Sequence, residues 1–391
     1  RDFCLSRGLG DVYKRQLHNP LTGWVLYASM GVDAADFWAQ YDHMYIPELG
    51  HNVSVTDYAH TLYIRASWTD FNPQEDVYGW KIDSNLRAYI EGAYQRNMRL
   101  AFRVVVDSRD KRTEFTPQFV KDAGAKGFMN KGKWSPYSDD PVFQKYYTKF
   151  VKALAKDFND PSKVEFIDGF GLGKWGEYHT MIYSTGDDTP KKAVFDWVTD
   201  IYSQAFDKVP VVINYHRWIG AGKDWVDDEH FAADSEEMLE EAIKKGYSLR
   251  HDAFGMTTYY GSWERRFAKK YRNICPIIME GGWIVKSHSY WQDPRGYRKD
   301  SHEDVRRGEF DDSKEAHVNM MDFRFGDTES WFKDAFDLVR RFLREGGYRL
   351  YPSEISLPLE VSKKTTPTIK HCWNNLGWGY CLSLIHISEP T

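Results

Sequence analysis

The chain has 391 residues, of which 42% are hydrophobic and 28% charged, which permits a sizeable buried core and argues against disorder. Its net charge of −5 disfavours a nucleic-acid-binding surface, because phosphate binding requires clustered Lys and Arg side chains. No apolar run is long enough to cross a bilayer, and the four cysteines show no metal-ligand spacing, so we expect no membrane span, metal or cofactor.

Both ends of the sequence resemble translated adapter sequence found in environmental assemblies. We therefore expect residues 1–16 and 382–391 to be non-native tails, which leaves 17–381 as the natural protein. The expected source is a bacterium. There the protein would be secreted or periplasmic, with a native N-terminus that this sequence does not contain.

Strand-like and helical segments alternate between residues 17 and 345. Strands are predicted at 24–29, 60–66, 99–106, 164–171, 210–214, 248–255, 274–280 and 317–323. Helices are predicted at 84–95, 142–157, 191–206, 236–245, 263–271 and 330–344, with Asp83 as N-cap of the first. This α/β pattern predicts a closed (β/α)8 TIM barrel. An open doubly wound sheet is disfavoured because no glycine-rich phosphate loop follows the first strand.

Two other segments have a different character. The polar stretch 285–312 separates the seventh and eighth strands and is expected to form a long loop that could act as a lid. Residues 346–381 show short alternating runs and prolines, which are typical of antiparallel strands. They are too few for an independent domain, so we expect a truncated C-terminal β-sandwich segment of two or three strands resting on the barrel.

Two glutamates stand where a barrel enzyme places its active residues, at the C-terminal ends of strands. Glu177 follows the fourth strand and Glu280 ends the seventh. A lone Glu in a loop is by default a solvated charge, but Glu280 ends an apolar strand. Aromatic neighbours of Glu177 would raise its pKa by desolvation and suit an acid. A carboxyl pair of this kind is what hydrolysis of a glycosidic bond requires.

Polar and aromatic side chains near other strand ends are predicted to line the same cleft. Each alone is more often structural, and Arg103 and Asp252 could form an ion pair. The aromatic content of 16% suits a packed core as well as a sugar site, where rings stack on sugar C–H faces. The predicted substrate-binding residues are Arg65, Trp68, Arg103, Trp175, His179, Asn214, His216, Asp252, Tyr259 and Trp283.

Several segments together carry a family resemblance over residues 17–381: LHNPLTGWVLY, ASWTDFNPQEDVYGWKID, LAFRVVVD, GFGLGKWGEYHT, LRHDAFG and PIIMEGG. They resemble an uncharacterised bacterial glycoside-hydrolase-like family in which a TIM barrel precedes a β-sandwich domain of unknown function. The chain is also distantly similar to the retaining clan A glycoside hydrolases. That resemblance implies Glu177 as acid/base, Glu280 as nucleophile, and a β-linked oligo- or polysaccharide as substrate.

The chain departs from the clan at one position, and other functions stay open. The clan usually has Asn immediately before the acid/base Glu, where it contacts the sugar 2-hydroxyl; Gly176 stands there, so either Asn214 or His179 takes over that contact or the resemblance is only distant. The barrel could instead bind carbohydrate without cleaving it. A metal-dependent hydrolase using three histidines and Asp252 is a third hypothesis, disfavoured because no HExxH spacing is present. Its histidines would be His179, His216 and His251.

Overall fold

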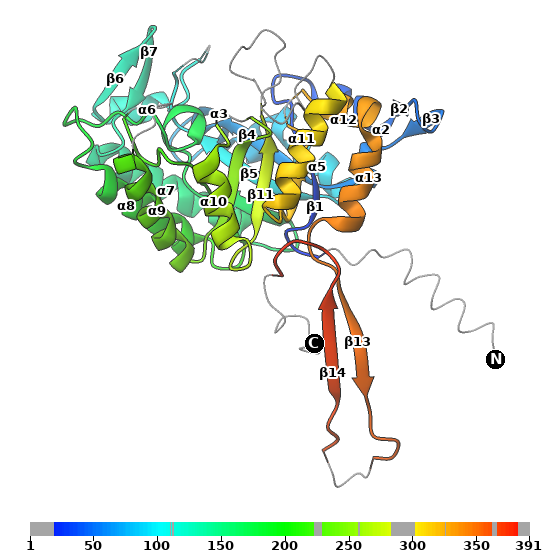
Figure 1. Cartoon of the computed structure of the whole chain (residues 1–391). Helices are drawn as coiled ribbons and strands as arrows, with labels where there is room; N and C mark the ends of the chain where they lie inside the picture. Colours follow the sequence, from blue (N-terminus) through cyan, green and yellow to red (C-terminus); the bar gives the residue numbers. More distant parts are fainter. Residues whose placement is uncertain are drawn as a thin grey trace.

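The computed structural model describes residues 19–381, apart from 110, 112, 223–228, 257–258, 283–301, 325 and 362–365. Its centre is a closed barrel of parallel strands surrounded by helices (Figure 1), which confirms the predicted (β/α)8 TIM barrel. The barrel strands overlap all the predicted ones. They are β1 (Gly23–Tyr27), β4 (Ala59–Ser67), β5 (Arg99–Val105), β8 (Val164–Asp168), β9 (Val211–Asn214), β10 (Ser248–Phe254), β11 (Ile277–Gly281) and β12 (Met320–Asp322).

The helices that cover the barrel follow from local sequence signals. Asp83 accepts a hydrogen bond from the backbone of Leu86 and begins α5 (Ser84–Gln95), as predicted. Asp140 caps α7 (Pro141–Phe158) in the same way. The other long helices are α2 (Ala34–Asp42), α8 (Lys191–Ala205), α9 (Glu229–Lys244) and α10 (Ser262–Tyr271). None of the helices in the described part of the chain combines the length and hydropathy that crossing a bilayer requires.

Short elements decorate the loops between these units. The short helices are α3 (Trp68–Phe71), α4 (Gly79–Ile82) and α6 (Gln118–Asp122), with 3-10 turns η1 (Val55–Asp57) and η2 (Lys174–Gly176). Two antiparallel hairpins also occur, β2 (Met44–Ile46) with β3 (His51–Val53), and β6 (Gly127–Asn130) with β7 (Lys133–Pro136).

The stretch 285–312 is not a loop throughout, because α11 (His302–Glu315) begins within it. The helix was missed because charged side chains interrupt the apolar ones on its inner face. Glu309 and Asp312 are fully buried on it, and Arg306 is 1% exposed. Ion pairs satisfy these groups: Arg306 with Glu309 at 2.7 Å, and Asp312 with Arg265 of α10 at 2.5 Å. An ion-paired face carries no apolar periodicity, so the helical pattern is hidden in the sequence.

The predicted helix 330–344 is two helices, α12 (Thr328–Asp334) and α13 (Phe336–Glu345). The chain leaves helical conformation at Ala335, with φ −146° and ψ 38°. No proline or glycine marks this break in the sequence. The predicted apolar face is nevertheless buried, since Phe332, Leu338 and Phe342 are at most 1% exposed.

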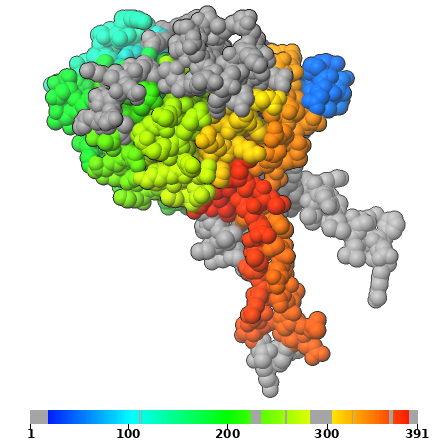
Figure 2. Space-filling model, viewed as in Figure 1, coloured from blue at the N-terminus to red at the C-terminus, as the bar shows by residue number. Residues whose placement is uncertain are grey.

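The C-terminal segment does not rest its strands on the barrel, contrary to the expectation. Antiparallel strands β13 (Leu350–Ser356) and β14 (Lys370–Asn375) form a hairpin that projects from the body (Figures 1 and 2). Contact with the barrel comes after the hairpin, where the Trp378 indole donates to the carbonyl of Val318 at 2.8 Å. The expectation failed because a hairpin with exposed residues on both faces has no side to bury. Whether 346–381 belongs to a β-sandwich stays a prediction.

The barrel interior has two layers, which position the site. The lower layer is an apolar cluster that includes Val25, Ala101, Phe166, Val212, Ile278 and Met320. Two residues further along the same strands, the inward side chains become polar. They include Arg103, Asp168, Asn214, Glu280 and Asp322. Because side chains in a strand alternate between faces, residues two apart point the same way, so the charged layer lies directly above the apolar one.

Candidate active site

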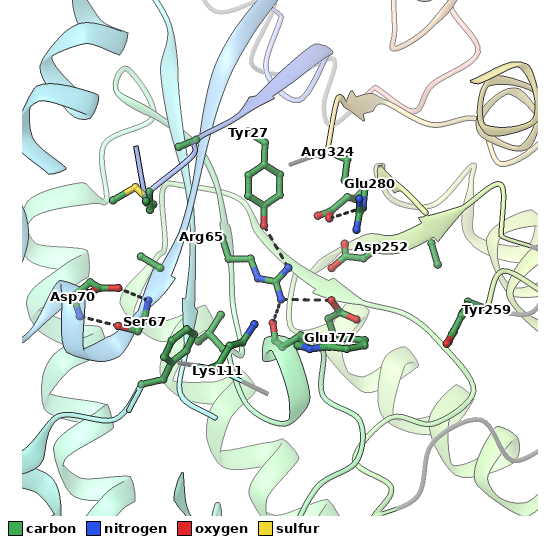
Figure 3. A pocket seen from close by; sticks show the side chains of 18 of the residues that line it. Tyr27, Arg65, Ser67, Asp70, Lys111, Glu177, Asp252, Tyr259, Glu280 and Arg324 are labelled. Atoms are coloured by element: carbon green, nitrogen blue, oxygen red, sulfur yellow. Dashed lines mark hydrogen bonds and ion pairs between the residues drawn. The ribbon is translucent and has the colours of Figure 1, made fainter. Parts of the chain in front are cut away.

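A pocket of about 560 Å³ opens above the charged layer, at the C-terminal ends of the barrel strands. Glu177 and Glu280 both line it, as do the predicted residues Arg65, Trp175, Asp252 and Tyr259 (Figure 3). Its volume lies within the usual range for small-molecule sites, about 300–1,000 Å³. The structure therefore brings these six residues together around one cavity.

Glu177 is held by a loop of unusual backbone conformation. Left-handed φ angles occur at Gly171, Gly173, Trp175, Gly176, Tyr178 and Thr180. A side chain at Gly176, which has φ +75°, would bring its Cβ to 3.3 Å from Val105 and 3.4 Å from Arg103. Glycine fits this position because it carries no Cβ. Such backbone strain is concentrated at functional sites, where surrounding structure maintains it.

Two guanidinium groups and one imidazole surround the Glu177 carboxyl group. Oε1 lies 3.7 Å from both Arg65 and Arg103, and Oε2 lies 3.5 Å from His179 Nε2. Arg65 also donates to the Trp175 carbonyl at 2.6 Å and to the Tyr27 hydroxyl at 3.3 Å (Figure 3). Burial, and then the charge of Asp252, raise the pKa of Glu177 to about 7. The group can therefore hold a proton near neutral pH.

Glu280 points into the same pocket from the end of β11 and is 5% exposed. Its Oε2 accepts a hydrogen bond from Arg250 at 2.5 Å, and Oε1 lies 4.0 Å from Arg324. Burial and the charge of Asp252 raise the pKa of Glu280, while Arg250 opposes that rise. Of the two glutamates, Glu280 is therefore the one that accepts a direct hydrogen bond from a guanidinium group.

The strand end behind Glu280 packs against α11. A Cβ at Gly281 would lie 2.5 Å from the Glu309 carboxyl, and one at Gly255 would lie 2.6 Å from the Glu309 side chain. Both glycines therefore make room for one buried glutamate. The close approach of helix and strand fixes the backbone that carries the candidate nucleophile.

Asp252 lies between the two glutamates and is ionised. The predicted ion pair with Arg103 is present, and Arg250 Nε donates to the second oxygen of Asp252 at 2.8 Å. Arg103 and Arg250 both depress the pKa of Asp252, against the opposing effect of burial. Arg103 also pairs with Asp168 at 2.7 Å, and Arg250 stacks over the Tyr63 ring at 4.5 Å. Arg103 is fully buried, so it acts on the pocket through the carboxyl groups that it contacts, those of Asp252 and Glu177.

A recess of about 30 Å³ adjoins the main pocket beside Glu177. It is lined by three further predicted residues, His179, Asn214 and His216, together with His251. This volume is close to the share of one water molecule in the liquid, about 30 Å³. The recess therefore suits a single small polar group.

The histidines of this recess are not arranged as metal ligands. His216 Nδ1 accepts the backbone N–H of Trp218 at 3.1 Å, and Nε2 donates to the Glu177 carbonyl at 2.7 Å. Both ring nitrogens are used, and burial lowers the pKa of His216 to about 3. Throughout the described ranges no cluster of three or more His, Cys, Asp or Glu residues could hold a metal ion. The metal-dependent hypothesis has no support there.

One predicted substrate contact, Trp68, does not line the pocket. Trp68 is fully buried and packs its ring edge-to-face against Phe143 and Tyr147 of α7, so it belongs to the hydrophobic core. The prediction failed because Trp68 is the first residue of α3 and its ring packs among aromatic side chains of α7 instead of lining the pocket. Trp283 lies outside the described residues.

Sequence reasoning missed several groups that the structure brings to the site. Tyr27 and Arg324 line the pocket from the ends of β1 and β12, while Arg250 and Asp322 lie just below. A usable signal existed for Arg250, since a charged residue inside an apolar strand, as in SLRHDAF, requires a buried partner. Tyr27 and Asp322 follow their inward apolar neighbours at the two-residue strand period.

No protein-family model matches the sequence, and no curated protein matches it either. Similar solved structures include exo-β-1,4-mannosidase Op5Man5 from Opitutaceae bacterium strain TAV5, 11% identical over 78% of this chain, with a TM-score of 0.44. This chain spans 52% of the mannosidase. Endo-glycoceramidase II from Rhodococcus sp. is 14% identical over 85% of this chain and 81% of its own, with a TM-score of 0.47. The intracellular xylanase TsXylA from Thermoanaerobacterium saccharolyticum is 8% identical over 77% and 85%, also at 0.47.

Proposed function

We propose that the chain is a glycoside hydrolase that cleaves a β-linked glycan with retention of configuration, using Glu280 as nucleophile and Glu177 as acid/base. One observation carries the proposal. Two mostly buried carboxyl groups from the ends of β8 and β11 line a single pocket, and their charge environments differ. Separate roles for two carboxyls follow from separate environments.

Glu177 is suited to the acid role because its pKa is raised to about 7. A general acid works best when its pKa lies near the working pH, since it must hold a proton and release it. In the first step Glu177 gives its proton to the leaving glycosidic oxygen. In the second step the resulting carboxylate takes a proton from the water that attacks the anomeric carbon.

Glu280 is suited to the nucleophile role because Arg250 donates directly to its Oε2, leaving Oε1 toward the pocket side where Arg324 lies. Its carboxylate attacks the anomeric carbon while the bond to the leaving oxygen breaks. The resulting glycosyl ester is then hydrolysed by water, which releases a sugar with its original configuration and regenerates the carboxylate. Arg65 lies 3.7 Å from Glu177 and stabilises the negative charge that develops on Glu177 when it gives up its proton.

The test uses the full chain with a panel of aryl β-glycosides that differ in sugar and in leaving phenol. We expect Glu280→Gln to lose kcat for every substrate, by about 10³-fold or more. Glu177→Gln should lose about 10²–10⁴-fold with poor leaving groups and much less with good ones, because a good leaving group needs no proton. The exposed Glu91→Gln on α5 serves as control and should cleave like wild type.

The stereochemistry of the first-formed sugar tests retention independently, and proton NMR of the anomeric centre measures it. Inversion would overturn the nucleophile role of Glu280 but leave the carboxyl pair in place. Binding of glycans without turnover, unaffected by either Gln variant, would instead favour the non-catalytic carbohydrate-binding barrel.

A further inference from the structure

The charged layer below the pocket contains more acidic than basic groups. Within the described residues its carboxyls are Asp168, Glu177, Asp252, Glu280 and Asp322. Its guanidiniums are those of Arg103 and Arg250, which are fully buried, and of Arg65, which is 18% exposed. Arg324 lies at the rim and is shared with Asp327 at 3.5 Å. Excess negative charge in a buried layer is costly, so carboxyl groups there retain protons.

Arg250 distinguishes between the two carboxyls on neighbouring strands. Glu280 and Asp322 are register partners on β11 and β12, so their side chains lie side by side. The same nitrogen, Arg250 Nη2, lies 2.5 Å from Glu280 Oε2 but 3.3 Å from Asp322 Oδ2. Glu280 therefore has the stronger stabilisation of its charge.

Asp322 has the poorer environment for a charge. It is fully buried, its Oδ1 accepts the backbone N–H of Arg324 at 2.7 Å, and its Oδ2 accepts only a long hydrogen bond from Arg250 Nη2, at 3.3 Å. The groups that face it are Arg250 from β10 and Glu280 from β11. On the other side its register partner is Val25 of β1, which contributes no charge.

We propose that Asp322 is a positioning residue that carries a proton as a neutral carboxylic acid, so that Arg250 stabilises the ionised carboxylate of Glu280. The inference rests on the proposed role of Glu280. Burial, followed by the charge of Glu280, raises the pKa of Asp322 to about 8, in agreement with this geometry.

This arrangement gives Asp322 a role without contact to substrate. An ionised Asp322 would compete with Glu280 for Arg250 and would repel its charge, which would leave Glu280 partly protonated and unable to attack. A neutral Asp322 removes both effects. The nucleophile is then ionised even though it is buried.

The first test measures the proton itself and requires no activity. Infrared spectroscopy resolves the carbonyl stretch of a protonated carboxylic acid from ionised carboxylates. The variant Glu177→Gln removes the other carboxyl group that can hold a proton near pH 7. In this variant the carboxylic-acid signal should persist between pH about 7 and about 8. Adding Asp322→Asn should remove one carboxylic-acid equivalent in that range. Asp327→Asn, a neighbouring carboxyl that is 18% exposed, is the matched control and should remove none.

The second test uses the pH profile of kcat/KM, whose acid limb reports ionisation of the nucleophile. If Asp322 is neutral, Asp322→Asn exchanges one neutral group for another, and the acid limb stays in place. A shift of that limb to lower pH by about 1 unit would show that wild-type Asp322 is charged, and would overturn the proposal.

The two tests separate this inference from the proposed function. Absence of a carboxylic-acid signal above pH about 7 in Glu177→Gln overturns the inference even if the protein is a glycosidase. Absence of any glycosidase activity overturns the proposed function while the infrared result still decides the protonation of Asp322. If Asp322→Asn does not fold, the absence of a carboxylic-acid signal in Glu177→Gln still overturns the inference.

Discussion

The lower and upper layers of the barrel interior come from the same strands but stabilise the protein in opposite ways. On β11 the inward side chains are Ile278 and, two residues later, Glu280; on β12 they are Met320 and Asp322. The apolar layer gains free energy by burial, at roughly 25 cal/mol per Å². The charged layer must recover the cost of desolvating its groups through ion pairs. The apolar layer that stabilises the barrel and the charged layer that forms the site are thus only two residues apart along each strand.

The largest expected effect comes from removing the group that holds the upper layer together. Arg250→Met should lower the free energy of unfolding by about 3–5 kcal/mol, because it leaves buried carboxylates without a partner. Urea denaturation at neutral pH measures the change. The control is Arg87→Met, whose side chain is 52% exposed, which should change stability very little. A loss for Arg250→Met as small as that of the control would contradict the view that the ion pairs are required.

A smaller effect depends on pH. The folded-state pKa of Glu177, about 7, exceeds its ordinary value of 4.5, so unfolding releases a proton between these values and stability falls as pH rises through that window. Above it the wild type bears a penalty of up to ~3 kcal/mol. Glu177→Gln should therefore be more stable than wild type at pH about 8, with the advantage shrinking toward pH about 5. Urea unfolding at both values measures it; an advantage independent of pH would refute the titration of this group.

The smallest effect is expected in the apolar layer. Ile278→Val removes one buried methylene and should cost about 0.5–1.5 kcal/mol. Since no titratable group changes, the cost should be equal at acid and alkaline pH, and the pH profile of activity should match wild type. A displaced pH profile would show that the two layers are coupled, because Ile278 lies two residues before Glu280.

The sequence predicted the architecture because the barrel strands are short apolar runs and most of them are followed by a helix with one apolar face. The two-residue strand period and the rule about strand ends were also enough to bring Glu177 and Glu280 to one pocket. Neither inference needs knowledge of distant contacts. The catalytic roles of these residues remain predictions that the proposed experiments test.

What the sequence did not predict depends on contacts between distant segments. The inner face of α11 is buried through ion pairs with α10 and with its own residues, so no apolar pattern exposes it. Trp68 looks like a sugar platform in the sequence, but α7 supplies the rings that enclose it. Arg250 stands inside an apolar strand, but the sequence does not show that its partners are carboxyl groups on β8, β10, β11 and β12. Such pairings between separate strands and helices carry no local signal.

The close packing of Gly281 against Glu309 has an evolutionary consequence. A side chain at position 281 would occupy the space of the Glu309 carboxyl, at 2.5 Å, and a shorter residue at 309 would open that space. Among natural relatives the two positions should therefore vary together rather than independently. The helix α11 would then evolve together with the strand that ends in Glu280, although none of its described side chains is among those that line the pocket.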